Sequence, residues 1–479
     1  MPRTVITHHA AHALSAYATS GFETTCVLVA DGMGSTVADL PSAERSVLVD
    51  SRGPISPLRE TISIYDASPA GLTPLEKHAG EPGLAEGDAA TPLGPFASLG
   101  LMYQAVAQLT FGSWDAAGKV MGLAPYGAPR FERALFFDLL EHPNATRLVF
   151  KRGLDGIRGR VPRLTTWGQS PEHDDLHRDL AASVQTALEE GLLALVRRAR
   201  ALSRSPRLAL AGGVFLNSVA NERVIASRLF DEVFIIPAAE DSGTAIGAAF
   251  HGVLQSLGPT RGRRLDKDAL GPLHRDFGPA LALARREGAA LHSTADPIDT
   301  AAALLAGGQV LGFFQGRSEL GPRALGQRSI LFDPRRRDGK ALLNARVKHR
   351  EAFRPFAPAV LLSRAAEYFA LEGESPFMLR VCRVKTPDLL PAVTHVDGTA
   401  RVQTVAEDGS PFHRLIAAFT AHTGVPVVLD TSFNVAGEPI VETPLDAVRC
   451  FLGTGIDALV LGPHLLVKDA NRPAGPPPR

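Results

Sequence analysis

Apolar residues recur along the chain in runs that alternate between strand-like and helix-like spacing. The run CVLVA at 26–30 predicts a buried strand that ends at Asp31, and TVIT near the N-terminus predicts a strand before a helix over HHAAHALSAYATS. The order of strand, turn and helix returns at LALAGGVFLNSVANERV and at EVFIIPAAEDSGTAIGAAFHGVL. This alternation predicts an α/β fold whose parallel or mixed sheet is covered by helices on both faces.

The intervening segments predict loops, further helices and a domain boundary. Residues 35–95 carry many Gly, Pro and Ser residues, which predicts hairpins and a long loop. Three- and four-residue apolar spacing predicts helices over SLGLMYQAVAQLTFG and over 173–203, and GKVMGLAPYG predicts a loop between them. The polar GPTRGRRLDKD at 258–268 separates this half from a second alternation, with central strands expected at PVVLDTS and DALVLG. We therefore predict domains over 1–262 and 263–470, and a disordered tail over 471–479.

Composition narrows the class of protein. A length of 479 residues favours two domains, and 45% hydrophobic with 21% charged residues is typical of a packed globular chain. The balance of 50 basic against 50 acidic residues argues against a nucleic-acid partner but permits a small anionic ligand. Three separated cysteines fit reduced thiols and a cytoplasmic location. The sequence also lacks the roughly 20-residue apolar run of a membrane span and the pattern of a secretory signal.

Histidines near the N-terminus predict a metal site. His8 and His12 are four residues apart, so a helix presents both on one face. Asp31 and Asp241, each after a predicted strand, can complete a set of two imidazoles and two carboxylates that suits iron, zinc or manganese. The alternative is an ordinary structural or surface pair. His9 points to another helix face, and no function is predicted for it.

Two glycine-containing segments are candidates for binding a nucleotide. Gly212 and Gly213 form a strand-to-helix turn followed by Asn217, where backbone N–H groups can face a phosphate. In GKVMGLAPYG, Lys119 can neutralise phosphate and Gly122 lets the backbone approach a ligand. A simple structural turn and a rigid structural loop are the alternatives.

A cluster of cationic residues in the second half predicts an anion site. Gly and Pro separate these cationic residues, whereas an exposed helix would place Glu at salt-bridge spacing. The residues are Arg317, Arg323, Arg328, Lys348, Arg350 and Arg354. Such residues favour bidentate binding of phosphate or carboxylate, and a salt-bridged surface is the alternative. The predicted ligand is a small, multiply charged anion.

Together, the motifs resemble the O-carbamoyltransferase family of the NodU and CmcH type, which includes TobZ. The resemblance spans nearly the whole chain and is carried by HHAAHA, VADG, GPFASLGLMY, GKVMGLAPYG, AGGVFLNSVANERV, EDSGTAIGAA, FFQGRSELGPRALGQRSI, VKHREAFRPFAP, DGTARVQTV and TSFNVAGEPIVETP. It implies a first domain similar to the Kae-type, actin-like ATPase (ASKHA) fold and a second domain similar to YrdC. It further implies that carbamoyl phosphate and ATP with Mg²⁺ give carbamoyl adenylate in the second domain. The first domain would then transfer the carbamoyl group to a hydroxyl of a natural-product acceptor, as in antibiotic tailoring.

The resemblance also assigns residues to roles. It implies a metal, Fe²⁺ or else Zn²⁺ or Mn²⁺, on His8, His12, Asp31 and Asp241, with His8 or His12 as the candidate that activates the acceptor hydroxyl. Gly212, Gly213 and Asn217 would hold the adenosine part. Catalytic Lys348 and Arg354, together with Arg401, would contact carbamoyl phosphate and ATP, and further contacts would come from Arg317, Arg323, Arg328, Ser432 and Asn434. Lys119, Gly122 and Arg350 remain nucleotide or anion candidates from the residue patterns described above.

One departure concerns the start of the chain. Members of the family usually carry about a hundred residues before the HHxAH helix, so the first lobe is expected to be incomplete here. A second chain or a homodimer would then supply the missing strands or cover the exposed sheet edge. Two other functions stay open: a truncated, partner-dependent or inactive nucleotide-binding homologue, and threonylcarbamoyl transfer to tRNA.

Overall fold

The computed structural model describes residues 5–49, 58–80, 98–142, 145–151, 159, 165–292, 294 and 296–468. The chain divides into two compact units, Met1–Leu265 and Asp266–Arg479, called unit 1 and unit 2 below. The predicted boundary between 262 and 263 lies three residues before the end of unit 1, and the predicted tail over 471–479 lies outside the described residues. Among the described residues, no helix combines the length and apolar character needed to span a bilayer.

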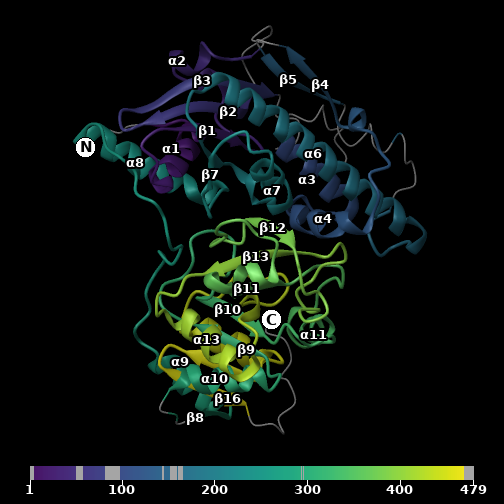
Figure 1. Cartoon of the computed structure of the whole chain (residues 1–479), viewed down its shortest axis with the longest axis vertical. Coiled ribbons are helices and arrows are strands. Elements are labelled where there is room, and N and C mark those ends of the chain that lie inside the picture. The colour runs from purple at the N-terminus through teal and green to yellow at the C-terminus, as the bar shows by residue number, and fades with distance from the viewer. Residues whose placement is uncertain are drawn as a thin grey trace. The chain divides into compact units, whose positions relative to one another are not determined.

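Unit 1 is built on a five-stranded mixed sheet in the order β3-β2-β1-β6-β7 (Figure 1). Its strands and helices are α1 (His8–Ser20), β1 (Thr25–Ala30), α2 (Ser42–Arg45), β2 (Arg59–Ser68), β3 (Gly71–Gly80), α3 (Leu99–Phe111), α4 (Ala117–Leu123), β4 (Phe137–His142), β5 (Ala145–Phe150), α6 (Asp174–Leu202), β6 (Arg207–Ala211), α7 (Ser218–Ala226), β7 (Glu232–Ile235) and α8 (Thr244–Leu257). Strands β1, β6 and β7 are parallel, β2 and β3 form an antiparallel hairpin against β1, and β4 with β5 forms a separate hairpin.

The sheet of unit 1 is buried because helices pack on both faces, as the alternation predicts. Every residue of β1 is buried, including Val27 and Leu28, whose side chains point to opposite faces. Helix α1 contacts β1, β2 and β6 and packs along α8, whereas α6 contacts β1 and packs with α3. The close approach of α1 and α8 depends on Gly247, because a Cβ at this position would lie 1.8 Å from the Ala11 carbonyl oxygen.

Unit 2 contains a nine-stranded mixed sheet in the order β12-β13-β11-β14-β10-β9-β15-β16-β8. Its elements are α9 (Gly278–Arg286), β8 (Ala289–His292), α10 (Pro297–Ala306), β9 (Leu311–Phe314), β10 (Arg328–Phe332), α11 (Gly339–Leu343), β11 (Ala357–Leu361), α12 (Ala365–Tyr368), β12 (Arg380–Arg383), β13 (Thr399–Val405), α13 (Pro411–Thr423), β14 (Val427–Ser432), α14 (Pro444–Gly453), β15 (Ala458–Leu461) and β16 (His464–Lys468). Alternate residues of β10 enter different cores: Ile330 and Phe332 enter one, and Leu331 enters the other with α10 and α13. The predicted strands at PVVLDTS and DALVLG are β14 and β15, inside this sheet.

Two predicted local structures are wrong. Residues 5–7 of TVIT are not in a strand, and Thr7 instead precedes α1. GKVMGLAPYG is not a loop: Ala117–Leu123 is helix α4, and a 3₁₀ turn over Ala124–Tyr126 follows. Burial of Val120 and Leu123 against the neighbouring helices offsets the low helix propensity of the glycines.

Candidate functional sites

Three parallel strands of unit 1 bring distant parts of the chain to one sheet edge. Because β1, β6 and β7 run in the same direction, their carboxyl ends meet at that edge. Asp31 follows β1, Gly212 and Gly213 follow β6, and Asp241 begins a 3₁₀ turn after β7. The close packing of α1 on α8 then places His8 beside these residues.

The four predicted metal ligands meet at this edge. His8 Nε2 lies 3.1 Å from Asp31 Oδ2 and 3.4 Å from Asp241 Oδ1. His12 Nε2 lies 3.1 Å from His8 Nε2, 3.5 Å from Asp241 Oδ1 and 3.9 Å from Asp31 Oδ2. One donor atom from each residue lies within 4.8 Å of the other three, which makes the cluster able to hold a metal ion.

The spacing and chemistry of the cluster fit one divalent cation. Bonds of about 2.0–2.2 Å to a tetrahedral ion place neighbouring donor atoms about 3.3–3.6 Å apart, close to the separations found here. The His12 side chain is fully buried, whereas that of Asp241 is 75% exposed, so the cluster is open to solvent on one side. A catalytic metal needs such an open side to reach a substrate.

The electrostatics of the cluster favour a positive charge at its centre. Burial alone would lower the pKa of His8, but hydrogen bonds to Asp241 and Asp31 and the charges of both carboxylates raise it to about 10. Hydrogen bonds from His12 and His8 lower the pKa of Asp241 below its ordinary value. Burial alone would raise the pKa of Asp31, but its hydrogen bond with His8 lowers it. Both carboxylates are therefore ionised at neutral pH and can bind a cation.

His9 lies on another face of α1, outside the four-donor cluster. Its side chain is fully buried, and Nδ1 is 2.8 Å from the Ser63 hydroxyl. Burial lowers the pKa of this imidazole to about 3, so it is neutral. The structure thus gives His9 a place in a buried polar network.

The glycine turn after β6 orients one of the metal-site carboxylates. Gly212 has φ of 100°, and a Cβ there would lie 2.2 Å from the Ala30 carbonyl oxygen. The Gly213 N–H donates to Asp31 Oδ1 at 3.1 Å. Asn217 caps α7 by accepting from the Ala220 N–H at 3.0 Å and donates to Gln185 Oε1 at 2.8 Å. Contacts of these residues with adenosine stay a prediction.

Lys119 and Gly122 lie on helix α4 rather than on a ligand-binding loop. The Lys119 ammonium lies 5.5 Å from the centre of the Phe111 ring, and Gly122 is buried. Contacts of Lys119 and Gly122 with a nucleotide stay a prediction.

Unit 2 brings together Lys348, Ser432 and Asn434. The Lys348 ammonium donates to the Ser432 hydroxyl at 3.1 Å, and to the carbonyl and side-chain oxygens of Asn434 at 3.0 and 2.7 Å. Burial, together with the positive charges of Arg350 and Arg354, lowers the pKa of Lys348 to about 7.

Arg350 and Arg354 act electrostatically on Lys348, and Arg401 acts on Arg350. Burial and the charges of Arg354 and Arg401 lower the pKa of Arg350 to about 9, and burial and Arg354 lower that of Arg401 to about 10. Glu351 lies 3.8 Å from Arg354, which makes it a weak partner. Guanidinium groups that depress one another's pKa values can stabilise a multiply charged anion, and contacts of these residues with phosphates stay a prediction.

The arginines of the GRSELGPRALGQRS segment differ in their surroundings. Arg317 is exposed and donates to the Gly271 carbonyl oxygen at 2.9 Å, and Arg323 is partly buried. Arg328 is fully buried, lies 3.7 Å from the centre of the Phe314 ring, and donates to the Gln315 carbonyl oxygen at 2.7 Å. Its guanidinium therefore stabilises the loop, and an additional contact with an anion stays a prediction.

Comparison with protein families agrees with the motifs. Residues 2–250 match the family described as carbamoyltransferase N-terminus, and residues 302–468 match the carbamoyltransferase C-terminus. The chain belongs to the carbamoyltransferase family. The family predicted from the sequence is thereby confirmed, and this carbamoyltransferase has the predicted α/β fold.

Several curated relatives resemble this carbamoyltransferase over most of its length. The nodulation protein NolO of Bradyrhizobium diazoefficiens is 38% identical over 98% of this chain and 79% of its own length. The 3'-hydroxymethylcephem-O-carbamoyltransferase of Amycolatopsis lactamdurans is 36% identical over 72% of this chain and 64% of its own length. Nodulation protein U of Sinorhizobium fredii is 32% identical over 71% of this chain and 62% of its own length.

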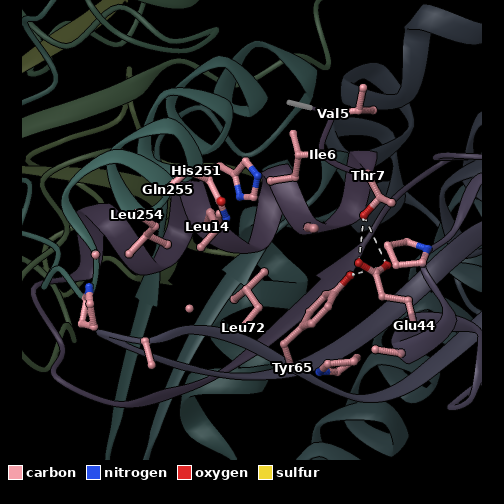
Figure 2. A pocket seen from close by; sticks show the side chains of 18 residues that line it. Val5, Ile6, Thr7, Leu14, Glu44, Tyr65, Leu72, His251, Leu254 and Gln255 are labelled. Carbon is pink, nitrogen blue, oxygen red and sulfur yellow. Dashed lines mark hydrogen bonds between the residues drawn. The ribbon is translucent and has the colours of Figure 1, made fainter. Parts of the chain in front are cut away.

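A pocket of about 360 Å³ in unit 1 of the carbamoyltransferase lies apart from the predicted site residues (Figure 2). Apolar side chains of Ile6, Leu14, Leu72 and Leu254 line it together with the carboxylate of Glu44. Helix α1 faces this pocket with residues other than the two metal-site histidines.

The charged residues packed under α1 were not predicted from the sequence. Glu60 and Lys77 have side chains that are 0% exposed, and they form an ion pair between β2 and β3. A lysine inside a strand, Lys77, was the one unusual feature of the sequence here. Its pairing with Glu60 and its place near the histidines depend on the register of β2 against β3, which the sequence does not show.

Proposed function

We propose that this chain is an ATP-dependent O-carbamoyltransferase with a different half-reaction in each unit. Unit 1 would be the Kae-like domain and unit 2 the YrdC-like domain. Family membership supports carbamoyl transfer in general. The assignment of one half-reaction to each unit is supported by the difference between the two sites. Imidazoles and carboxylates cluster in unit 1, and cationic side chains cluster in unit 2.

Unit 2 would form the activated intermediate. Water cleaves carbamoyl phosphate into carbamate and phosphate, and the carbamate oxygen then attacks the α-phosphate of ATP, giving carbamoyl adenylate and pyrophosphate. Lys348, Arg354 and Arg401 would neutralise the phosphate charges, with Ser432 and Asn434 orienting the lysine through the hydrogen bonds described above. Mg²⁺ would accompany ATP.

Unit 1 would complete the transfer. The acceptor hydroxyl attacks the carbamoyl carbon, and AMP leaves. The hydroxyl proton passes to a base, for which the candidate is His8 or His12 through a ring nitrogen that does not bind the metal. His8, His12, Asp31 and Asp241 would hold the metal, and their mixed nitrogen and oxygen donors suit Fe²⁺, Zn²⁺ or Mn²⁺. A bound cation at this place would polarise the carbamoyl oxygen. The acceptor would be a hydroxylated small molecule, in keeping with the cephem named for one relative.

The experiment that tests this function follows both half-reactions. The chain is incubated with ATP, Mg²⁺ and carbamoyl phosphate, and pyrophosphate is measured; a control omits carbamoyl phosphate. Pyrophosphate release that depends on carbamoyl phosphate is the expected result. Mass spectrometry of hydroxylated natural products added to the reaction would then detect the gain of one carbamoyl group. Absence of pyrophosphate at every concentration of carbamoyl phosphate would contradict the proposal.

A further inference from the structure

The first turn of α1 is held by residues from outside the helix. The Thr7 side chain does not cap α1; instead the His8 N–H donates to Ser35 Oγ at 2.9 Å, and the His9 N–H donates to Glu60 Oε1 at 2.9 Å. Glu60 Oε1 also accepts from the Ser35 N–H at 3.1 Å. A carboxylate is a favourable partner for the positive end of a helix dipole. One oxygen atom thus connects the start of α1 to the segment that follows β1.

Lys77 fixes this carboxylate in place. Its ammonium donates to Glu60 Oε2 and to Ser63 Oγ at 3.0 Å, and lies 2.8 Å from Glu44 Oε2. The ammonium therefore has two hydrogen-bond acceptors and a second carboxylate as an ion-pair partner. Buried charges keep their positions only when paired and hydrogen-bonded in this way, and removing one partner is strongly destabilising.

Glu44 extends the network to the residue before His8. It accepts hydrogen bonds from the Thr7 hydroxyl at 3.1 Å and the Tyr65 hydroxyl at 3.4 Å, and Figure 2 shows both hydroxyls directed at its carboxylate. The network therefore holds α1 at Thr7 through Glu44 and at His9 through Glu60, on either side of His8.

We propose that Glu60 is a positioning residue for a divalent cation bound by His8 and His12, with Lys77 fixing the Glu60 carboxylate. The inference rests on the proposed metal site. The two imidazoles come from α1, whereas the two carboxylates come from the strand ends, so a common bonding distance requires that α1 neither slides nor turns. Groups that orient metal ligands typically contribute about 10–100-fold to metal affinity.

The test measures metal affinity separately from stability. Co²⁺ and Zn²⁺ are titrated into the full chain by calorimetry, with the visible absorption of Co²⁺ as a second signal, and thermal unfolding of the metal-free protein is recorded in parallel. Glu60→Ala is expected to raise the Kd for Co²⁺ by about 10–100-fold. Glu60→Gln keeps the acceptor oxygen for the His9 N–H and should retain most of the affinity.

The matched control is Glu76→Ala on the neighbouring strand β3. Glu76 is also a buried, paired carboxylate, which bonds His78 and Arg198 but no N–H group of α1. This variant should lower the unfolding temperature without changing the Kd for Co²⁺. Equal weakening by Glu60→Ala and Glu76→Ala, or a wild-type Kd in Glu60→Ala, would overturn the positioning role.

Two further outcomes are decisive. If Glu60→Ala does not fold, Glu60→Leu combined with Lys77→Met replaces it, because the two changes remove both charges of the buried ion pair together with the acceptor of the His9 N–H. A weakened Co²⁺ affinity in this double variant supports the proposal, and an unchanged Kd overturns it. A wild-type chain that binds neither Co²⁺ nor Zn²⁺ would instead reject the metal site itself, and the positioning role with it.

Discussion

At the scale of single residues, His12 gives the most direct test of the metal site. Its side chain is fully buried and offers Nε2 to the cluster. His12→Ala should reduce carbamoyl transfer by more than about 100-fold, because a lost ligand costs more than a lost supporting group. Pyrophosphate formation should continue, since Lys348 and the arginines lie in unit 2. His251→Ala, a change on α8 outside the cluster, is the control and should preserve both half-reactions. Equal loss of both half-reactions in His12→Ala would contradict a division between two sites.

Lys348 makes anion binding depend on pH. Its pKa is lowered from 10.5 to about 7. In the protein without a bound anion, the Lys348 ammonium therefore loses its proton and its charge as the pH rises through 7. A bound anion stabilises the ammonium, so binding above pH 7 takes up a proton and weakens by up to about tenfold per pH unit. Sulfate is a suitable probe because it does not titrate in this range. Calorimetry at pH 8 in two buffers of different ionisation enthalpy measures the proton uptake. Lys348→Met should bind sulfate more weakly and without this pH dependence.

The same pKa has a consequence for stability in the absence of an anion. The unfolded chain protonates Lys348 below about pH 10.5, whereas the folded chain does so only below about pH 7. The contribution of Lys348 to the free energy of unfolding therefore falls as the pH drops from 10.5 to 7, and the penalty is complete below 7. Because a buried Lys348 lowers the free energy of unfolding near neutral pH, we expect this lysine to be needed for binding a ligand.

The sequence predicts some residues of the sites because their signals are local. His8 and His12 are recognisable from helical spacing alone, and Asp31 from its place after an apolar run. Glu60 is not recognisable, because its importance comes from two N–H groups that only the folded chain brings to it, one from His9 on α1 and one from Ser35 after β1. The burial of Arg328 could not be predicted either, because its local sequence resembles that of Arg317 and Arg323, which are not fully buried.

At the scale of elements, the crossing of α1 and α8 controls the geometry of the cluster. A side chain at Gly247 would collide with the Ala11 carbonyl oxygen, so Gly247→Val must push α8, and with it Asp241, away from the histidines. Overpacking of this kind costs about 1–3 kcal/mol, and the affinity for Co²⁺ should fall together with the unfolding temperature.

The same helix provides the control for this change. Gly252 has no atom within 4 Å of its Cβ position, so Gly252→Ala should stabilise α8 by up to about 1 kcal/mol through helix propensity and leave Co²⁺ binding unchanged. Unchanged Co²⁺ affinity in Gly247→Val would show that the cluster does not depend on this crossing.

Helices and strands with a strong hydrophobic periodicity are predicted from the sequence. Those that form only because of tertiary packing are not. Helix α6 and the buried strand β1 match their patterns because each pattern reports which side chains contact a core. Helix α4 was predicted as a loop because three of its features, Gly118, Gly122 and the nearby Pro125, indicate a break in isolation. Tertiary burial of Val120 and Leu123 outweighs that local tendency.

At the scale of the whole molecule, the proposed function requires an intermediate made by one unit to be used by the other. Carbamoyl adenylate reacts with water, so transfer is efficient only when the intermediate stays within the protein. Arg354→Ala should stop adenylate formation, and His12→Ala should stop transfer. A mixture of the two variants contains one working copy of each unit, but on separate chains.

This mixture distinguishes retained from released carbamoyl adenylate. With an acceptor that the wild-type chain carbamoylates, the mixture should release pyrophosphate, because the His12→Ala chains still activate carbamate. It should give little carbamoylated product, because an intermediate that leaves one chain is hydrolysed before it meets another. Product is measured by mass spectrometry against an equal amount of wild type. Product approaching half the wild-type yield would mean that carbamoyl adenylate travels freely through solution, and that linking both units in one chain serves a purpose other than protecting it.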